Sequence, residues 1–272
     1  MANLELPRRP FGRTGLSVAP LGLSGSYGID ADSVERAFHE LSINYFFVTP
    51  RMQGMCEGLR RLIKAGHRDK LVLATGVNLP TGSAVRSKWA DLTKQLGTDR
   101  IDVFQVFWVR WRWYLEGRTG TELRKLREEG KVKAIGISTH ERKMAVPFAR
   151  EFDLDMLMIR YNAAHRGAEK EVFAGLPEKR PAVVTYTATR WGRLLKPAGS
   201  LGPMTAPECY RFALSQPVVD VVLTGPKSWD ELRTNAEGVV LGPLAPERLA
   251  EVRTFGDAVH AAATSRFGFG RN

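Results

Sequence analysis

Ile101-Asp-Val-Phe-Gln-Val-Phe107 is an apolar run that precedes a helical stretch, Glu122–Glu129, and a second apolar run, Ala134-Ile-Gly-Ile-Ser138. Both runs are mostly apolar rather than alternating, which is typical of parallel strands that are buried on both faces. The stretch between them has the periodicity of an amphipathic helix. This order of elements predicts a βαβ unit with two parallel strands.

The same unit recurs outward from this stretch in both directions. The further strands are predicted at Val18–Leu23, Asn44–Val48, Leu71–Ala74, Met156–Tyr161, Ala182–Tyr186 and Val219–Thr224. The further helices are predicted at Asp32–Leu41, Gly54–Lys64, Ser83–Gln95, Arg142–Arg150, Ala168–Phe173, Ala206–Leu214 and Ser228–Gly238. Eight such units predict an α/β fold, the (β/α)8 or TIM barrel, and their even spacing favours it over a doubly wound sheet.

Two elements flank the eight units. The turn signal in Pro10–Leu16 predicts an N-terminal β-hairpin. Residues Pro246–Ala263 predict an extra C-terminal helix. We see no linker or internal repeat, so we expect residues 1–272 to form one domain.

Composition narrows the class of protein. The 272 residues are 43% hydrophobic and 25% charged, which is typical of a globular protein, and no apolar run is long enough to cross a membrane. The net charge of +11 is spread along the chain without a Lys/Arg block, which favours a solvated surface over a nucleic-acid site. Cys56 and Cys209 cannot form a disulfide framework. We therefore expect a cytoplasmic protein.

In a TIM barrel, functional residues gather in the loops that follow the strands. One of these loops, Thr224-Gly-Pro-Lys-Ser228, ends the eighth strand and opens a helix. Gly225 allows close backbone approach, the helix start offers free N–H groups, and Lys227 adds positive charge, so the loop suits a phosphate. The alternative is a turn in which Ser228 caps the helix. No Walker loop or GxGxxG motif is present.

Two other kinds of site have weaker support. The five histidines are not spaced as paired ligands, so we expect no metal, although His140 and His165 fall in loops at the predicted active face. The stretch Trp108–Tyr114 alternates aromatic and basic residues, which can serve nucleic-acid binding. We favour an aromatic wall above the barrel for this stretch.

Six segments, in the same order along nearly the whole chain, resemble the aldo-keto reductases, which are NADP(H)-dependent barrel enzymes. The segments are Phe11–Leu23, Leu96–Gln105, Glu129–Ser138, Tyr161-Asn162, Tyr186–Gly192 and Gly225–Asn235. The resemblance implies a barrel fold and an NADP(H) site.

The resemblance also implies which residues hold the cofactor. Ser138 and Thr139 match the pair that binds the nicotinamide carboxamide, and Tyr186 matches the aromatic residue that stacks on the nicotinamide ring. The full set implied is Ser138, Thr139, Tyr186, Thr187, Gly225, Lys227, Ser228 and Asn235. Met158 replaces a glutamine that normally assists the carboxamide pair, and Glu231 stands where the family often has arginine or glutamine.

The catalytic set of the family is absent. Aldo-keto reductases use Asp, Tyr, Lys and His, whose matching positions here are Val48, Gln53, Gly76 and Phe107. Removing one partner of a buried charge pair is costly, so the concerted loss of the whole set is physically consistent. A glutamine amide cannot transfer a proton as tyrosine does.

A proton for carbonyl reduction would therefore need another source. The candidate catalytic residues are Tyr27, His140, Arg51 and Arg110, and Tyr45 is a weaker candidate because it lies within a strand. The residues expected to line a substrate pocket are Gln53, Phe107, Trp108, Trp111, Trp113 and Trp191.

Three functions remain open. The leading hypothesis is an atypical NADP(H)-binding oxidoreductase with a rebuilt active site, acting on a specialised apolar or aromatic small molecule. The second is a non-redox enzyme on the same scaffold, such as an isomerase, dehydratase or cyclase, and the third is a non-catalytic cofactor-binding protein. We expect neither nucleic acid nor membrane as a partner.

Overall fold

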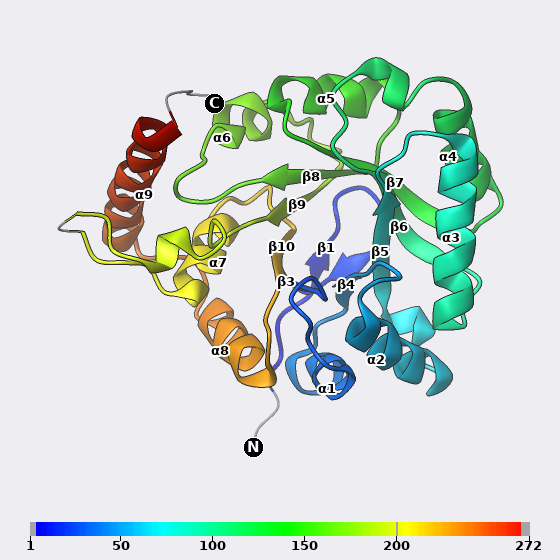
Figure 1. The fold of residues 1–272 in the computed structure, drawn as a ribbon, viewed down its shortest axis with the longest axis horizontal. Coiled ribbons are helices and arrows are strands. Elements are labelled where there is room, and N and C mark those ends of the chain that lie inside the picture. Colours follow the sequence, from blue (N-terminus) through cyan, green and yellow to red (C-terminus); the bar gives the residue numbers. More distant parts are fainter. Residues whose placement is uncertain (1–3, 200, 268–272) are drawn as a thin grey trace.

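Eight parallel strands close into a barrel in the order β10-β3-β4-β5-β6-β7-β8-β9 (Figure 1). The computed structural model describes residues 4–199 and 201–267, the last five by backbone alone. The barrel strands are β3 (Leu21–Ser24), β4 (Tyr45–Phe47), β5 (Val72–Val77), β6 (Ile101–Val106), β7 (Val132–Thr139), β8 (Met156–Arg160), β9 (Ala182–Tyr186) and β10 (Val221–Thr224). The predicted closed barrel is confirmed, and the doubly wound sheet is excluded.

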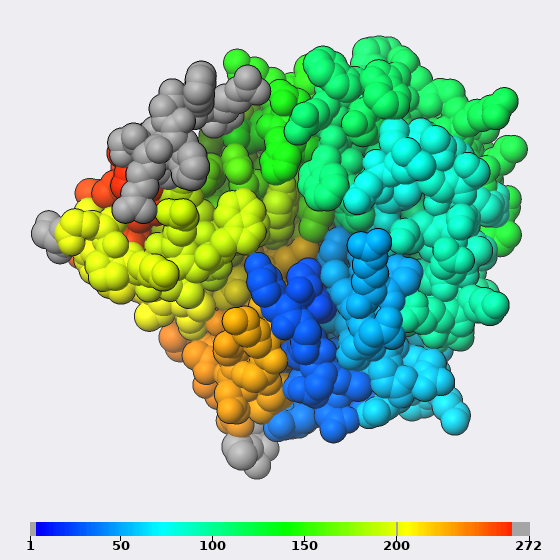
Figure 2. Space-filling model, viewed as in Figure 1, coloured from blue at the N-terminus to red at the C-terminus, as the bar shows by residue number. Residues whose placement is uncertain are grey.

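Helices surround the strands, and in the space-filling view the segments form one closed ring from blue through green to orange (Figures 1 and 2). The α-helices are α1 (Ala31–Leu41), α2 (Gln53–Lys64), α3 (Gly82–Leu96), α4 (Gly117–Glu128), α5 (Arg142–Glu151), α6 (Ala168–Glu171), α7 (Ala206–Leu214), α8 (Trp229–Val240) and α9 (Pro246–Phe267). The short 3₁₀ helices are η1 (Arg68–Lys70), η2 (Arg112–Tyr114), η3 (Phe173–Gly175) and η4 (Arg193–Leu195). Among the described residues, no helix combines the length and apolar character needed to span a membrane.

The predicted hairpin is also confirmed, as β1 (Arg9–Pro10) pairs antiparallel with β2 (Ser17–Val18). Its turn lies against the amino end of the barrel, because the Arg13 N–H donates to the carbonyl of Arg180, just before β9, at 3.1 Å. Inside, the rings of Phe11 and Tyr45 lie 5.4 Å apart, and both side chains are fully buried. The hairpin therefore closes the end of the barrel opposite the functional loops.

The extra C-terminal helix, α9, packs on the loops that follow β8 and β9. Arg166 pairs with Asp257 of α9 at 2.7 Å. The guanidinium of Arg190 donates to the carbonyl of Val259 at 2.6 Å. Helix α9 thus fixes two loops at the carboxyl end of the barrel.

Most predicted bounds differ from the observed ones, and the predicted helix Glu122–Glu129 begins earlier, at Gly117. Two of the differences have a clear physical reason. The predicted strand Val18–Leu23 is split: Val18 belongs to the hairpin and the barrel strand begins at Leu21. Pro20 separates them, since it has no N–H to continue a ladder. The predicted helix Ala168–Phe173 stops at Glu171, because a 3₁₀ turn follows in which Gly175 N–H donates to the carbonyl of Val172.

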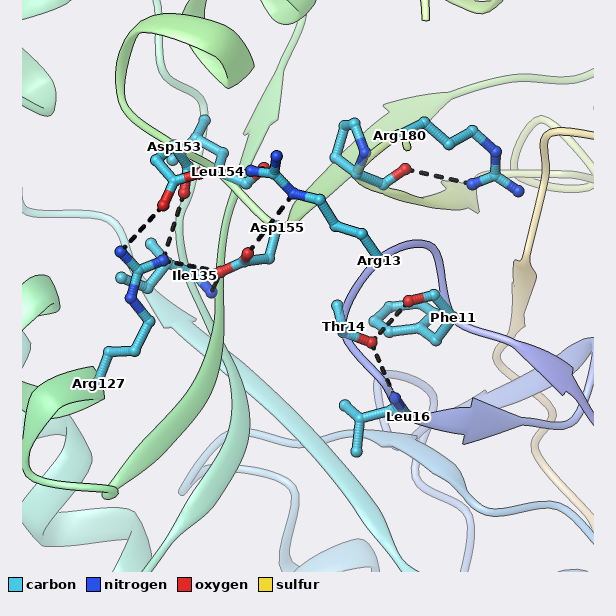
Figure 3. Close-up of polar contacts among 11 residues, drawn as sticks. Phe11, Arg13, Thr14, Leu16, Arg127, Ile135, Asp153, Leu154, Asp155 and Arg180 are labelled. Atoms are coloured by element: carbon cyan, nitrogen blue, oxygen red, sulfur yellow. Dashed lines mark hydrogen bonds and ion pairs between the residues drawn. The ribbon is translucent and has the colours of Figure 1, made fainter. Parts of the chain in front are cut away.

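Carboxylates at the amino end of the barrel tie neighbouring strands together. Asp155, which precedes β8, accepts a hydrogen bond from the Ile135 N–H of β7 at 2.9 Å. Arg127 reaches the same carboxylate at 3.2 Å, and Arg13 of the hairpin lies 3.9 Å away on another side (Figure 3). One side chain thereby joins a strand, a helix and the hairpin.

Asp102 and Asp220 repeat this arrangement. Asp102 accepts from Leu73 N–H at 2.8 Å and pairs with Arg68 at 2.9 Å. Asp220 accepts from the Val183 N–H at 2.8 Å and pairs with Arg180 at 2.7 Å. A buried charge that is both paired and hydrogen-bonded is tolerated in a protein interior.

Candidate functional site at the carboxyl end of the barrel

The loop after β6 is fastened to β7 by two of the predicted cofactor residues. Ser138 Oγ accepts from the Trp108 N–H at 2.9 Å, and this bond holds Trp108 at a φ of 54°. Thr139 Oγ1 donates to the carbonyl of Val109 at 2.7 Å. Ser138 and Thr139 are both buried. Thr139 is therefore engaged in shaping the mouth of the barrel. The Ser138 hydroxyl donates to no acceptor in the described structure, so its proton is available to a ligand.

The floor of the mouth is apolar where β5 and β6 meet. A Cβ placed on Gly76 would lie 2.4 Å from the carbonyl oxygen of Gln105 and 2.8 Å from Cζ of Phe107. The Phe107 ring packs edge-on against Phe47, with centroids 5.8 Å apart. Val48, which follows β4, is fully buried in the cluster that the helices share rather than in the one inside the barrel. The chain therefore has no room for a longer side chain at position 76.

Gln105 is a buried polar residue that the sequence analysis did not single out. Its side chain is fully buried, and neither amide atom has a hydrogen-bond partner in the described part of the chain. Gln105 pairs in register with Gly76 on one side and Gly136 on the other. An unsatisfied buried amide costs about 1–3 kcal/mol, so it marks a position that structure alone does not explain.

Tyr186, His140 and Arg160 form a group at the mouth, which we call the Tyr186 group. The Tyr186 hydroxyl lies 3.5 Å from Nδ1 of His140. Arg160 pairs in register with Tyr186 at the carboxyl ends of β8 and β9. His140 stands at the surface, but the shielded part of its ring, together with the charges of Arg160 and Arg110, lowers its pKa. His140 is therefore neutral at neutral pH.

Burial and charge oppose each other at Tyr186. Burial raises the pKa of its hydroxyl, and the nearby positive charge of Arg160 lowers it. The protonated phenol is thus the form present at neutral pH, and it can donate a hydrogen bond.

Arg160 was also missed by the sequence analysis. It is half-buried, its Nε is shielded from water, and within residues 4–199 and 201–267 this Nε has no hydrogen-bond partner. Burial lowers the pKa of its guanidinium. The available signal was its place two residues after Met158, on the face of β8 that points into the barrel.

The predicted catalytic residues are divided between two places. Arg110 is exposed and acts electrostatically on His140, so these two lie on the same side of the mouth. Arg51 and Gln53 instead line a cavity of about 580 Å³ between the loops after β3 and β4. There the Gln53 amide donates to the carbonyl of Pro50 at 3.1 Å. No contact in the described structure joins Arg51 to His140.

Tyr27 lies over the loop after β10. Its side chain is 52% exposed, and a Cβ on Gly225 would lie 2.7 Å from its ring. Tyr45, the weaker candidate, lies deep in the barrel, where burial raises the pKa of its hydroxyl. It is a packing residue next to the hairpin.

The start of α8 has the geometry of a capped helix, which was the alternative to a phosphate loop. Ser228 Oγ accepts from the Glu231 N–H at 3.3 Å. The Glu231 carboxylate accepts from the Lys227 N–H at 2.8 Å. The ammonium group of Lys227 is on an exposed residue. One N–H that a phosphate could use is therefore already bound by a carboxylate.

Asn235 and Thr187 have structural partners. The Asn235 amide is buried and donates to Thr224 Oγ1 at 3.2 Å. Thr187 has a φ of 57°, and its carbonyl accepts from the Asn162 amide at 2.9 Å. These contacts position the loops after β9 and β10.

The remaining candidates lie at the rim or behind it. Trp108, Trp111, Trp113 and Trp191 are between 51% and 64% exposed and stand in solvent rather than enclosing a pocket. The ring of His165 packs 5.3 Å from that of His260 on α9. Among the described residues, no group of three His, Cys, Asp or Glu side chains could hold a metal ion.

Comparisons with known proteins support one family. The model of the Aldo/keto reductase family matches residues 52–206. The D-threo-aldose 1-dehydrogenase of a Pseudomonas species is 31% identical over 119 residues, which is 42% of this chain and 36% of that protein. The chain thus matches about a third of this curated relative's length.

Solved structures agree on the fold. The holo form of the aldo-keto reductase AKR11C1 from Bacillus halodurans superposes with a TM-score of 0.78 at 22% identity, covering 93% of this chain and 97% of that chain. Its apo form gives a TM-score of 0.76 with the same identity and coverage.

Proposed function

Since this chain belongs to the aldo/keto reductase family, we propose that it is an NADP(H)-binding oxidoreductase with a rebuilt active site. The substrate is a specialised apolar or aromatic small molecule. The observation that carries this proposal is the Tyr186 group, which places a neutral histidine and a phenol above an apolar floor and beside exposed tryptophans.

The residues at both ends of the proposed cofactor site suit a nicotinamide dinucleotide. The Ser138 hydroxyl keeps a free proton, and the ring of Tyr186 is only half-buried. At the far end the exposed Lys227 ammonium suits the 2′-phosphate. Ser138, Thr139, Tyr186, Thr187, Gly225, Lys227, Ser228 and Asn235 would hold the dinucleotide, which supplies or accepts hydride when bound.

The proton is handled by the chain itself. Because His140 is neutral at neutral pH, it can accept the proton that a substrate hydroxyl releases as its carbon loses hydride. The Tyr186 hydroxyl lies within reach of the same imidazole and orients it. These roles favour oxidation of an alcohol at neutral pH, with Arg110 beside His140 and with Tyr27 and Arg51 at the edge of the site.

The usual catalytic set of the family plays no part in this proposal. Val48, Gln53, Gly76 and Phe107 stand at the matching positions. The contacts around Gly76 leave no space for lysine, and Gln53 is turned toward a backbone carbonyl.

The test is a titration of the protein with NADPH, followed by cofactor fluorescence, and repeated with Lys227→Ala. We expect saturable binding that weakens about tenfold in the variant, because a charge-assisted contact to phosphate is lost. NADH, which lacks the 2′-phosphate, should bind both proteins equally. Lys133→Ala, which removes an exposed lysine at the amino end, is the matched control.

Turnover separates the remaining hypotheses. Oxidation of aromatic alcohols by NADP⁺ that is lost in His140→Gln supports the oxidoreductase. Binding without turnover of any aromatic alcohol or aldehyde favours a non-catalytic cofactor-binding protein. Absence of NADPH binding would contradict both the oxidoreductase and the cofactor-binding protein, and would favour a non-redox enzyme. The hydrogen bonds that the Asn235 amide and the Lys227 N–H make within the chain are consistent with that alternative.

In this proposal the negative charge of Glu231 weakens binding of the 2′-phosphate. Its carboxylate occupies the Lys227 N–H, so Glu231→Gln should tighten NADPH binding by about three- to tenfold while leaving NADH unchanged. Asp230→Asn changes the net charge equally without touching Lys227, and should have little effect. Equal effects of the two variants would show that only overall charge matters.

A further inference from the structure

Arg160 differs from most of the other shielded arginines. Arg190 also has no ion pair among the described residues, but its guanidinium donates to the carbonyl of Val259 at 2.6 Å. Arg68 pairs with Asp102 at 2.9 Å, Arg180 with Asp220 at 2.7 Å and Arg142 with Glu171 at 2.5 Å. Arg160 has no ion pair or hydrogen bond in the part of the chain that the structure describes, and its Nε is shielded from water. A shielded cation without a counter-charge is unfavourable unless something else supplies one.

The position of Arg160 directs it to the mouth of the barrel. Along β8, Met156 and Met158 belong to the cluster inside the barrel, and alternation puts Arg160 on the same face at the carboxyl end. Its register partner Tyr186 also borders this cluster. The guanidinium therefore lies at the upper edge of the barrel interior.

Among the described residues, the charged groups around Arg160 are mostly cationic. Its charge acts on His140, His165 and Arg190, and Arg142 acts on it in turn. The one carboxylate among the groups that act on His140 is the exposed Glu141, and it forms no ion pair with Arg160 in the described structure. Among the described residues, no carboxylate forms an ion pair with Arg160.

We propose that Arg160 is the centre of an anion site that binds the carboxylate or phosphate of a ligand in the barrel mouth. Arginine suits this role, because its planar fork can donate two parallel hydrogen bonds to such a group. The Tyr186 hydroxyl can donate a further hydrogen bond. The half-buried Tyr186 ring beside the guanidinium suits an aromatic group on the same ligand, so the site selects an aromatic acid or aromatic phosphate.

This inference depends on the proposed function in one respect only: both place the ligand in the mouth of the barrel. The shared chemistry is an anion, and two sources can supply it: a substrate, or a phosphate of the dinucleotide. The shielding of Nε and the apolar floor favour an anion that enters the barrel interior, which a small substrate does more easily than a diphosphate.

The experiment is calorimetric titration with benzoate, phenyl phosphate, benzamide and NADP⁺. Benzamide has the size of benzoate without its charge. The proteins are the unmodified chain, Arg160→Gln, Arg160→Lys and the control Arg118→Gln, which removes an exposed arginine on the outer helix α4. Thermal melting of each variant establishes that it is folded.

We expect benzoate and phenyl phosphate, but not benzamide, to bind the unmodified protein. Arg160→Gln should weaken benzoate at least about tenfold, Arg160→Lys less so, and Arg118→Gln not at all. Loss of benzoate binding with unchanged NADP⁺ binding assigns the anion to the substrate. Loss of NADP⁺ binding alone assigns it to the cofactor.

Unchanged binding of benzoate, phenyl phosphate and NADP⁺ in folded Arg160→Gln would overturn the proposal. The outcome is separable from the proposed function. A protein that binds benzoate through Arg160 but does not bind NADPH would retain this site and lose the oxidoreductase.

Discussion

The two ends of the barrel differ in how their buried charges are paired. At the amino end, Asp102, Asp155 and Asp220 each accept a strand N–H and each pair with arginine. At the carboxyl end, Arg160 is shielded and has no such partner among the described residues. The amino end therefore serves stability, whereas the carboxyl end carries an uncompensated charge that a ligand can neutralise.

Cavity size does not separate the two ends. A cavity of about 1030 Å³ opens at the amino end, where Arg8, Lys70, Arg100 and Lys133 are among its lining residues. The cavity of about 580 Å³ that Arg51 lines is at the carboxyl end. The pairing of the charges, rather than the volume, distinguishes the site.

The largest expected effect comes from breaking an amino-end pair. Asp102→Ala would leave Arg68 buried without its carboxylate and Leu73 N–H without its acceptor. We expect a loss of about 3–5 kcal/mol in the free energy of unfolding, measured by urea denaturation. A loss below about 1 kcal/mol would mean that these pairs are not structural.

The next effect concerns the floor of the mouth. Gly76→Ala should lower the free energy of unfolding by about 1–3 kcal/mol, because its Cβ meets the Gln105 carbonyl and the Phe107 ring. Gly202→Ala is the control, since its Cβ would meet nothing within 4 Å. Equal stability of the two variants, in the same urea experiment, would show that the paired backbones of β5 and β6 shift easily to accommodate the Cβ.

A smaller effect of opposite sign is expected at Arg160. Arg160→Met removes a shielded charge that has no partner, so the variant should be as stable as the parent or more stable by about 1 kcal/mol. Thermal and urea unfolding measure this difference. A destabilisation as large as that of Asp102→Ala would erase the contrast between the two ends.

The last effect depends on pH and is the smallest only at neutral pH. Burial, followed by the charge of Arg160, lowers the pKa of His165 from 6.5 to about 3. Between these values the unfolded chain binds more protons than the folded chain, so stability is full above about pH 6.5 and falls as the pH drops toward 3. His165→Gln should flatten this part of the stability profile. His39→Gln, at an exposed histidine, should leave it unchanged.

The fold could be predicted from the sequence because buried parallel strands appear as apolar runs that recur along the chain, with a helix after each. Ala182–Tyr186 and Ala206–Leu214 were predicted with their observed bounds. The failure at Val18–Leu23 arose because the apolar residues of the hairpin and of β3 run together, and only the missing N–H of Pro20 separates them.

The site was less predictable. The sequence pointed to His140 and Tyr186 individually, but their contact joins the loop after β7 to the end of β9, and the two residues are 46 positions apart. Arg160 escaped notice because a charged residue that ends a strand is usually solvated or paired. Its lack of an ion pair among the described residues is visible only in the folded structure.

The most direct test of the contrast between the two ends is hydrogen exchange, followed by mass spectrometry, with and without saturating NADPH and benzoate. We predict protection in the loops after β7, β9 and β10, with no change around Asp102, Asp155 and Asp220. Protection confined to the segments that line the amino-end cavity would contradict the account.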